Sequence, residues 1–182
     1  MTVSLDLTLF DLIVDGAAKE SPLWASAAKT PGKREVVPVF SPLVRDPLLT
    51  LGVETIYEGY LVHYGHSRLF SQVDADDTLL LGDYLYAHGL VRVSATGNKA
   101  AVNDLAELIS LCAQLGAESR QGDGAAWAAT AARLGEGILG PARVALRDLA
   151  DSAPLLAAAR EAAPEADVAA SLALHLRFLP AR

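Results

Sequence analysis

The stretch that most constrains the fold is residues 76–96, DDTLLLGDYLYAHGLVRVSAT. Its apolar residues cover most of a helical wheel, which predicts one long helix that is buried on most sides. Asp76 or Asp77 can accept hydrogen bonds from the unpaired amides at its start. Gly82 and Gly89 are seven residues apart and share one face. Each glycine weakens a helix interior by about 1 kcal/mol relative to alanine, so the pair indicates that another backbone packs closely there.

The rest of the chain predicts more helices and no sheet. The chain has 182 residues, of which 52% are hydrophobic, and this suits one helical domain over residues 1–182. Alanine and leucine dominate the second half, and no segment alternates as a strand does. We therefore expect an all-α bundle of about seven to nine helices. The segments expected to be helical are 3–19, a short helix after Ser21-Pro22, 48–70, 76–96, 99–118, 125–138, a helix from Pro141 to about 149, one from Pro154, and 165–178.

Composition also limits the classes of binding partner and the cellular compartment that we expect. The net charge is −7 and no basic cluster is present, which argues against binding to nucleic acid along the chain. No segment approaches 18 uninterrupted apolar residues, so we expect no membrane span. The N-terminus lacks the pattern of a signal peptide, and we expect a cytoplasmic protein. Cys112, the single cysteine, lies in an apolar helical pattern that indicates a buried thiol rather than a nucleophile.

Two clusters of polar residues suggest a metal as an alternative. His63 and His66 are three residues apart near Glu54 and Glu58, and two histidines with a carboxylate can bind a transition metal. A third histidine, His88, would have to come from the next helix. We interpret these histidines as core or surface residues, and keep a small helical enzyme with a histidine-based metal site as the alternative.

The second cluster is acidic. Asp74, Asp76 and Asp77 could coordinate magnesium through oxygen, or they could cap the helix that follows. We favour capping.

The sequence also contains motifs of a known family. LVH at 61–63, Arg68 and LLLGDYLYAHGL at 79–90 resemble the central region of trans-polyprenyl diphosphate synthases, over about residues 53–120. The resemblance implies an isoprenoid-synthase-like helical bundle, shortened here. The family also has a basic loop that holds a diphosphate, and the segment with Lys33 and Arg34 between Gly32 and Pro38 resembles it loosely. The resemblance therefore implies Lys33, Arg34, His63 and Arg68 as ligand-binding residues.

The chain departs from the family where the family binds magnesium. After the histidine the family places its first aspartates, and this chain has Tyr64 and Gly65. Downstream, only Asp148 and Asp151 occur where a second aspartate-rich motif belongs. Prenyl transfer ionises an allylic diphosphate, which requires magnesium held by carboxylates. We therefore expect no catalytic residues, no bound metal and no cofactor in this chain alone.

The family includes a role for such a chain. Some members pair a catalytic subunit with a smaller partner that lacks the aspartate-rich motifs and lines the end of the product tunnel. The resemblance implies a non-catalytic subunit or pseudo-enzyme, as a homodimer or as a heterodimer with a catalytic prenyl diphosphate synthase subunit, that acts through dimerisation and an apolar tunnel. A further alternative is a carrier for an apolar anionic ligand, with Lys33 and Arg34 on its head group.

Overall fold

The computed structural model describes residues 3–72 and 74–180, and in them the chain is all-α, as predicted. Across the described residues nine α-helices and three short 3-10 helices alternate with loops, and the one β-type pairing is an isolated bridge between Ala28 and Phe70. The α-helices are α1 (Val3–Glu20), α2 (Pro22–Ala27), α3 (Thr50–Tyr64), α4 (Ala75–Ser94), α5 (Lys99–Ala117), α6 (Asp123–Ala132), α7 (Gly140–Leu149), α8 (Ala153–Ala162) and α9 (Glu165–Phe178). The 3-10 helices are η1 (Pro31–Lys33), η2 (Ser41–Leu43) and η3 (Pro47–Leu49).

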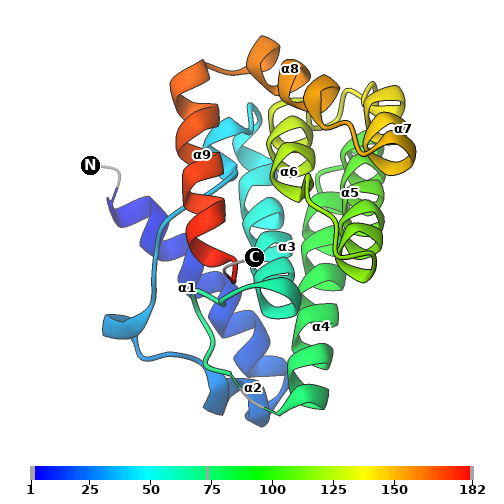
Figure 1. The fold of residues 1–182 in the computed structure, drawn as a ribbon. Helices are drawn as coiled ribbons and strands as arrows, with labels where there is room; N and C mark the ends of the chain where they lie inside the picture. The colour runs from blue at the N-terminus through cyan, green and yellow to red at the C-terminus, as the bar shows by residue number, and fades with distance from the viewer. Residues whose placement is uncertain (1–2, 73, 181–182) are drawn as a thin grey trace.

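The centre of the fold is the pair α3 and α4, which run antiparallel side by side (Figure 1). A Cβ atom added at Gly89 would overlap Ile56 Cγ1 and would lie 3.0 Å from the carbonyl oxygen of Gly52. One added at Gly82 would overlap the imidazole of His63. The predicted close approach at the two glycines is confirmed, and it leaves no room for a tunnel between these two helices.

The acidic segment before α4 caps the helix, as predicted, but through a different residue. The Asp74 side chain accepts a hydrogen bond from the backbone N–H of Asp77 at 2.9 Å. Asp76 and Asp77 lie within the first turn, where negative charge complements the helix dipole. Ser21 caps α2 in the same way, accepting from the N–H of Leu23 at 3.2 Å.

The predicted helix 48–70 is wrong at its C-terminal end. Helix α3 stops at Tyr64, and the chain leaves it at Gly65. The end of α9 explains the break, because the Phe178 carbonyl accepts a hydrogen bond from the N–H of His66 at 2.8 Å. A Cβ at Gly65 would lie 2.6 Å from the same carbonyl oxygen. His63 is therefore on the helix and His66 is not, so the two do not occupy neighbouring helix positions.

Helix α6 also ends earlier than the predicted 125–138. It stops at Ala132, and the chain turns through Gly135 and Gly137, whose φ angles are +86° and +68°. Glycine adopts this left-handed conformation without steric cost. The Asp104 carboxylate accepts hydrogen bonds from both glycine N–H groups, at 2.9 and 3.3 Å, and so holds the turn against α5.

Helix α6 packs against α5, α8 and α9 (Figure 1). Its alanines let α8 approach closely, and Trp127 fills the space toward α3. The Trp127 ring lies 5.0 Å from that of Tyr57 and 5.5 Å from that of Phe40, between ring centroids. The ring of His175 in α9 lies 5.4 Å from that of Phe40 and 5.9 Å from that of Tyr57, so the same cluster joins α9 to α3. No helix in the described part of the chain is long and apolar enough to cross a membrane.

Candidate functional site

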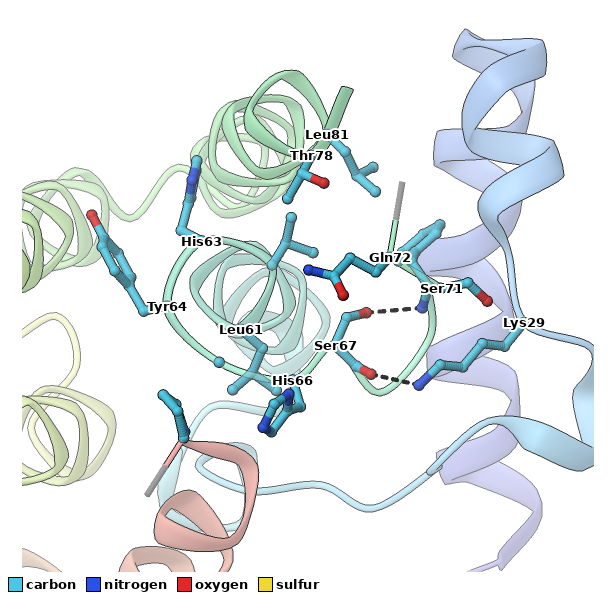
Figure 2. Close-up of a pocket in the computed structure, with 14 residues that line it drawn as sticks. Lys29, Leu61, His63, Tyr64, His66, Ser67, Ser71, Gln72, Thr78 and Leu81 are labelled. Atoms are coloured by element: carbon cyan, nitrogen blue, oxygen red, sulfur yellow. Dashed lines mark hydrogen bonds between the residues drawn. The ribbon is translucent and has the colours of Figure 1, made fainter. Parts of the chain in front are cut away.

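A pocket of about 440 Å³ opens at the C-terminal end of α3, and we call it the α3 pocket. It is lined by the segment after α2, the last turn of α3, the irregular segment 65–72, the start of α4 and Pro180 after α9. None of the described residues that line it is acidic. Its basic and polar lining includes Lys29, His63, His66, Ser67, Ser71 and Gln72 (Figure 2).

Backbone pairing between two distant segments sets the position of Lys29. The Lys29 N–H donates to the Leu69 carbonyl at 2.8 Å, and the Ser71 N–H donates to the Ala27 carbonyl at 2.8 Å. This pairing lays the end of α2 along the segment after α3, so the Lys29 ammonium reaches the Ser67 carbonyl at 2.6 Å (Figure 2). An ammonium has three N–H donors, and the Ser67 carbonyl takes one of them.

His63 lies against the backbone of α4, in the space that Gly82 leaves by lacking a side chain. Its Nε2 atom is 3.2 Å from Asp83 Oδ1, which is close enough for an ion pair. The two atoms are not aligned for a hydrogen bond, and Nε2 is buried without a hydrogen-bond partner. Burial lowers the pKa of His63 below its usual 6.5, and the nearby Asp83 offsets this only in part. His63 is therefore neutral at pH 7. An anion in the pocket would raise the pKa of His63 and so favour its protonated form.

Arg68, expected at the ligand, lies in the interior instead. Its Nε donates to Glu58 at 2.9 Å and its NH1 donates to Glu54 at 2.7 Å, and none of the three side chains is exposed. The guanidinium also lies 5.0 Å from the ring centroids of Phe10 and Tyr57. Burial acts to lower the pKa of Arg68, but the two glutamates outweigh it and raise the pKa. No pattern in the sequence indicates that Glu54 and Glu58 contact this arginine inside the fold.

These buried ions hold the loop before α3 in place. Glu54 accepts from the backbone N–H groups of Val39 and Ser41, at 3.0 and 3.2 Å. Arg68 NH1 also donates to the Val37 carbonyl at 2.8 Å. The N–H groups of Val39 and Ser41 thus bond to a buried carboxylate, which fixes this loop against α3.

The two predicted basic-loop residues do not line the α3 pocket. Arg34 donates to Asp11 at 2.6 Å and to the Lys29 carbonyl at 2.8 Å, and Lys33 is exposed in η1. Of the four expected ligand-binding residues, the structure brings only His63 to this pocket. Lys29 was not among the predicted site residues, because it is a single lysine between alanine and threonine without any motif around it.

The three histidines of the metal alternative are not brought together. His63 and His66 line the α3 pocket, whereas His88 stacks on Tyr84 at 5.1 Å and lies near Gly16 of α1. Within residues 3–72 and 74–180, no group of three or more His, Cys, Asp or Glu side chains is close enough to hold a metal ion.

No family model, curated protein or solved structure matches this chain. A functional assignment must therefore rest on the chemistry of the described side chains. The α3 pocket combines an ammonium and two imidazoles with the apolar side chains of Leu61, Phe70 and Leu81. This combination suits an anionic group attached to an apolar one.

Proposed function

We propose that this chain is a non-catalytic, isoprenoid-synthase-like subunit that binds a prenyl diphosphate or a similar apolar anion in the α3 pocket without a metal ion. The observation that supports it most is the local structure at Tyr64 and Gly65, the positions where the resembling family has aspartates. Gly65 packs against the Phe178 carbonyl, and an aspartate there would collide with it. The end of α9 thus occupies the place that a magnesium-binding side chain would need.

The charges in the pocket favour an anion directly. The Lys29 ammonium can donate to a phosphate oxygen while it keeps its bond to Ser67. His66 and protonated His63 would add further donors. Leu61, Phe70 and Leu81 would then cover the apolar part that adjoins the head group.

The same lining argues against turnover. Ionising an allylic diphosphate places high negative charge on the leaving group, and magnesium ions held by carboxylates normally stabilise that charge. With a lysine and two histidines but no acidic residue in the described lining, the pocket suits binding without bond cleavage.

Exposed apolar side chains on α4 support a partner, either a second copy or a catalytic prenyl diphosphate synthase subunit. Leu79, Leu80 and Val91 are 54%, 57% and 63% exposed. A stable subunit interface needs an apolar patch at its centre. Size-exclusion chromatography alone and with a prenyl diphosphate synthase from the same host tests this part, and a monomer that forms no complex would contradict it.

Calorimetric titration with inorganic diphosphate and with geranyl diphosphate, both in EDTA, tests the binding. We expect both to bind without metal and the prenyl compound to bind more tightly. A charge-assisted hydrogen bond contributes about 1.5–3 kcal/mol, so Lys29→Met should weaken binding about tenfold to a hundredfold. Lys33→Met is the matched control, because it removes the same charge from an exposed site outside the pocket.

Three results would contradict the proposal. Equal loss of affinity in Lys29→Met and Lys33→Met would show that the net charge of the chain, and not the pocket, governs binding. Failure of both ligands to bind would remove the site. Magnesium-dependent elongation of a prenyl diphosphate by the purified chain would show that it is an enzyme. Binding of geranyl diphosphate with no effect on any synthase would favour the carrier alternative instead.

A further inference from the structure

A second pocket, of about 600 Å³, lies between α6, the start of α8 and the C-terminal half of α9, and we call it the α6–α9 pocket. This volume is in the range of small-molecule sites in proteins. Its described lining includes four leucines from α8, from α9 and from the residue after α9, and these are Leu156, Leu172, Leu176 and Leu179. Leu176 is 70% exposed, so a ligand in the pocket would remove from water apolar surface that folding leaves exposed.

Two titratable side chains of the lining, Asp123 of α6 and His175 of α9, have hydrogen-bond partners inside the protein. Both are buried. The Tyr60 hydroxyl donates to Asp123 Oδ2, and His175 Nε2 lies 3.3 Å from the same oxygen. His175 Nδ1 lies 3.0 Å from the Tyr57 hydroxyl. Because the protein itself supplies these partners, neither side chain needs a ligand to complete its hydrogen bonds.

A charged ligand would gain little in this pocket. The described residues that line it include no lysine or arginine, and both ring nitrogens of His175 are engaged within the protein. An anion would lose hydration beside the Asp123 carboxylate, whose charge repels it. A cation would lose hydration beside a carboxylate that already has partners in the protein. The lining therefore favours an uncharged molecule.

The more accessible polar side chains of the lining suit a hydroxyl group. Gln121 is exposed and Ser152 is half-buried. The Ser152 side chain caps no amide at the start of α8. A ligand hydroxyl can donate one hydrogen bond and accept others, so it can pair with the serine hydroxyl or the glutamine amide without carrying a charge.

We propose that the α6–α9 pocket binds an uncharged aliphatic alcohol, with its hydrocarbon chain along the four leucines and its hydroxyl near Gln121 and Ser152. The site is separate from the α3 pocket in its charge and in nearly all of its described lining, with Pro180 common to both. An anion in the α3 pocket and an alcohol in the α6–α9 pocket are independent binding events. This inference goes beyond the proposed function and does not depend on it.

Calorimetric titration with octanol, octanoate and octylammonium tests the selection against charge, because the three ligands have equal chain length. We expect octanol to bind at least about tenfold more tightly than either ion, since neither ion gains a partner that replaces its hydration. Hexanol tests the apolar contact. Each buried methylene changes the affinity about threefold to fourfold, so octanol should bind about tenfold more tightly than hexanol.

An exposed leucine of the lining provides the variant that locates the ligand. Leu176→Ser removes apolar contact to the hydrocarbon chain and should weaken octanol binding at least about threefold. Because the side chain is 70% exposed, we expect this variant to fold. Leu149→Ser is the matched control, since Leu149 is 76% exposed at the end of α7 and does not line the pocket, and its octanol affinity should equal that of the natural protein.

Several results would overturn the proposal. Failure of octanol to bind would remove the site. Octanoate or octylammonium binding as tightly as octanol would show that the pocket does not select against charge. Hexanol binding as tightly as octanol would show that the chain is not buried, and unchanged octanol affinity in Leu176→Ser would place the ligand elsewhere. Inorganic diphosphate binding to Leu176→Ser reports on the α3 pocket, so failure of one site is distinguishable from failure of the other.

Discussion

The close approach of α3 and α4 predicts a large effect from a very small substitution, Gly89→Ala. On an isolated helix this change stabilises by about 1 kcal/mol, because alanine is the better helix former. In this fold the new Cβ would overlap Ile56 Cγ1 and would lie 3.0 Å from the Gly52 carbonyl oxygen and 3.1 Å from the Ile56 nitrogen. Ordinary carbon contacts lie at about 3.5–4.0 Å, so the helices must move apart.

The size of the destabilisation depends on which neighbouring atoms can move away from the new Cβ. A side chain such as Ile56 can change rotamer, but the backbone atoms of α3 cannot move without separating the two helices. Overpacking a core costs about 1–3 kcal/mol, and backbone contacts place this site at the upper end. After the propensity gain is subtracted, we expect Gly89→Ala to destabilise by about 2 kcal/mol, or to lower Tm by about 4–8 °C for a chain of this size.

Urea denaturation measures the change. The matched control is Gly140→Ala at the start of α7, where a new Cβ would meet nothing within 4 Å, and we expect a change within about 0.5 kcal/mol. In an Ile56→Ala background the nearest obstacle is gone, so Gly89→Ala should cost about 1 kcal/mol less than in the natural protein. A Gly89→Ala variant as stable as the natural protein would refute the close packing.

Further predictions concern single side chains. Arg68→Met should destabilise the fold by about 3–5 kcal/mol, because it leaves two buried carboxylates without a cation. Arg45→Met, at an exposed ion pair, should cost under about 1 kcal/mol. Equal losses of unfolding free energy for the two variants in urea denaturation would refute the buried pairing. Burial lowers the pKa of His63 in the native state, so the unfolded chain binds the proton more readily and stability falls as pH drops through 6.5. His63→Gln should reduce that fall, measured by thermal melts from about pH 7.5 to 5.5, and an unchanged slope would count against it. Burial also raises the pKa of the Cys112 thiol, so a disulfide reagent should react slowly with the native protein and rapidly with the protein unfolded in urea. A fast reaction with the native protein would show that the thiol is accessible and would contradict its burial. Asp74→Ala should cost about 1 kcal/mol by removing the cap of α4, and no loss in a urea melt would refute that role.

The helices were largely predictable, because local patterns specify them. The predicted segment 165–178 matches α9, and Ser21-Pro22 starts α2 as expected. The glycine pair on one face of α4 also indicated a close neighbour, which proved to be α3. Errors arose where a distant segment decided the outcome. Helix α3 ends at Tyr64 because the Phe178 carbonyl meets Gly65, and nothing near Gly65 in the sequence reveals that contact.

The candidate site was much less predictable. Only His63, of the expected ligand-binding residues, lines the α3 pocket, and the resemblance that suggested it stays a proposal. Lys29 reaches the same pocket through backbone pairing between segments about 40 residues apart in the chain, an arrangement that local sequence does not encode. The resemblance implied Arg68 as a ligand-binding residue, and its contacts with Glu54 and Glu58 became visible only in the structure.

The sequence by itself determined where most helices form, which faces of them are apolar, and that the positions after His63 hold no carboxylate. These are properties of neighbouring residues, and helical periodicity and capping express them directly. The tertiary structure alone decided which charges are buried as pairs and which face a cavity. It buried Arg68 between two glutamates, left Lys29 at the α3 pocket, and placed Asp123 of α6 beside His175 of α9. Those outcomes depend on contacts between helices that are far apart in the sequence. Such contacts determine which charges surround each side chain and whether water reaches it.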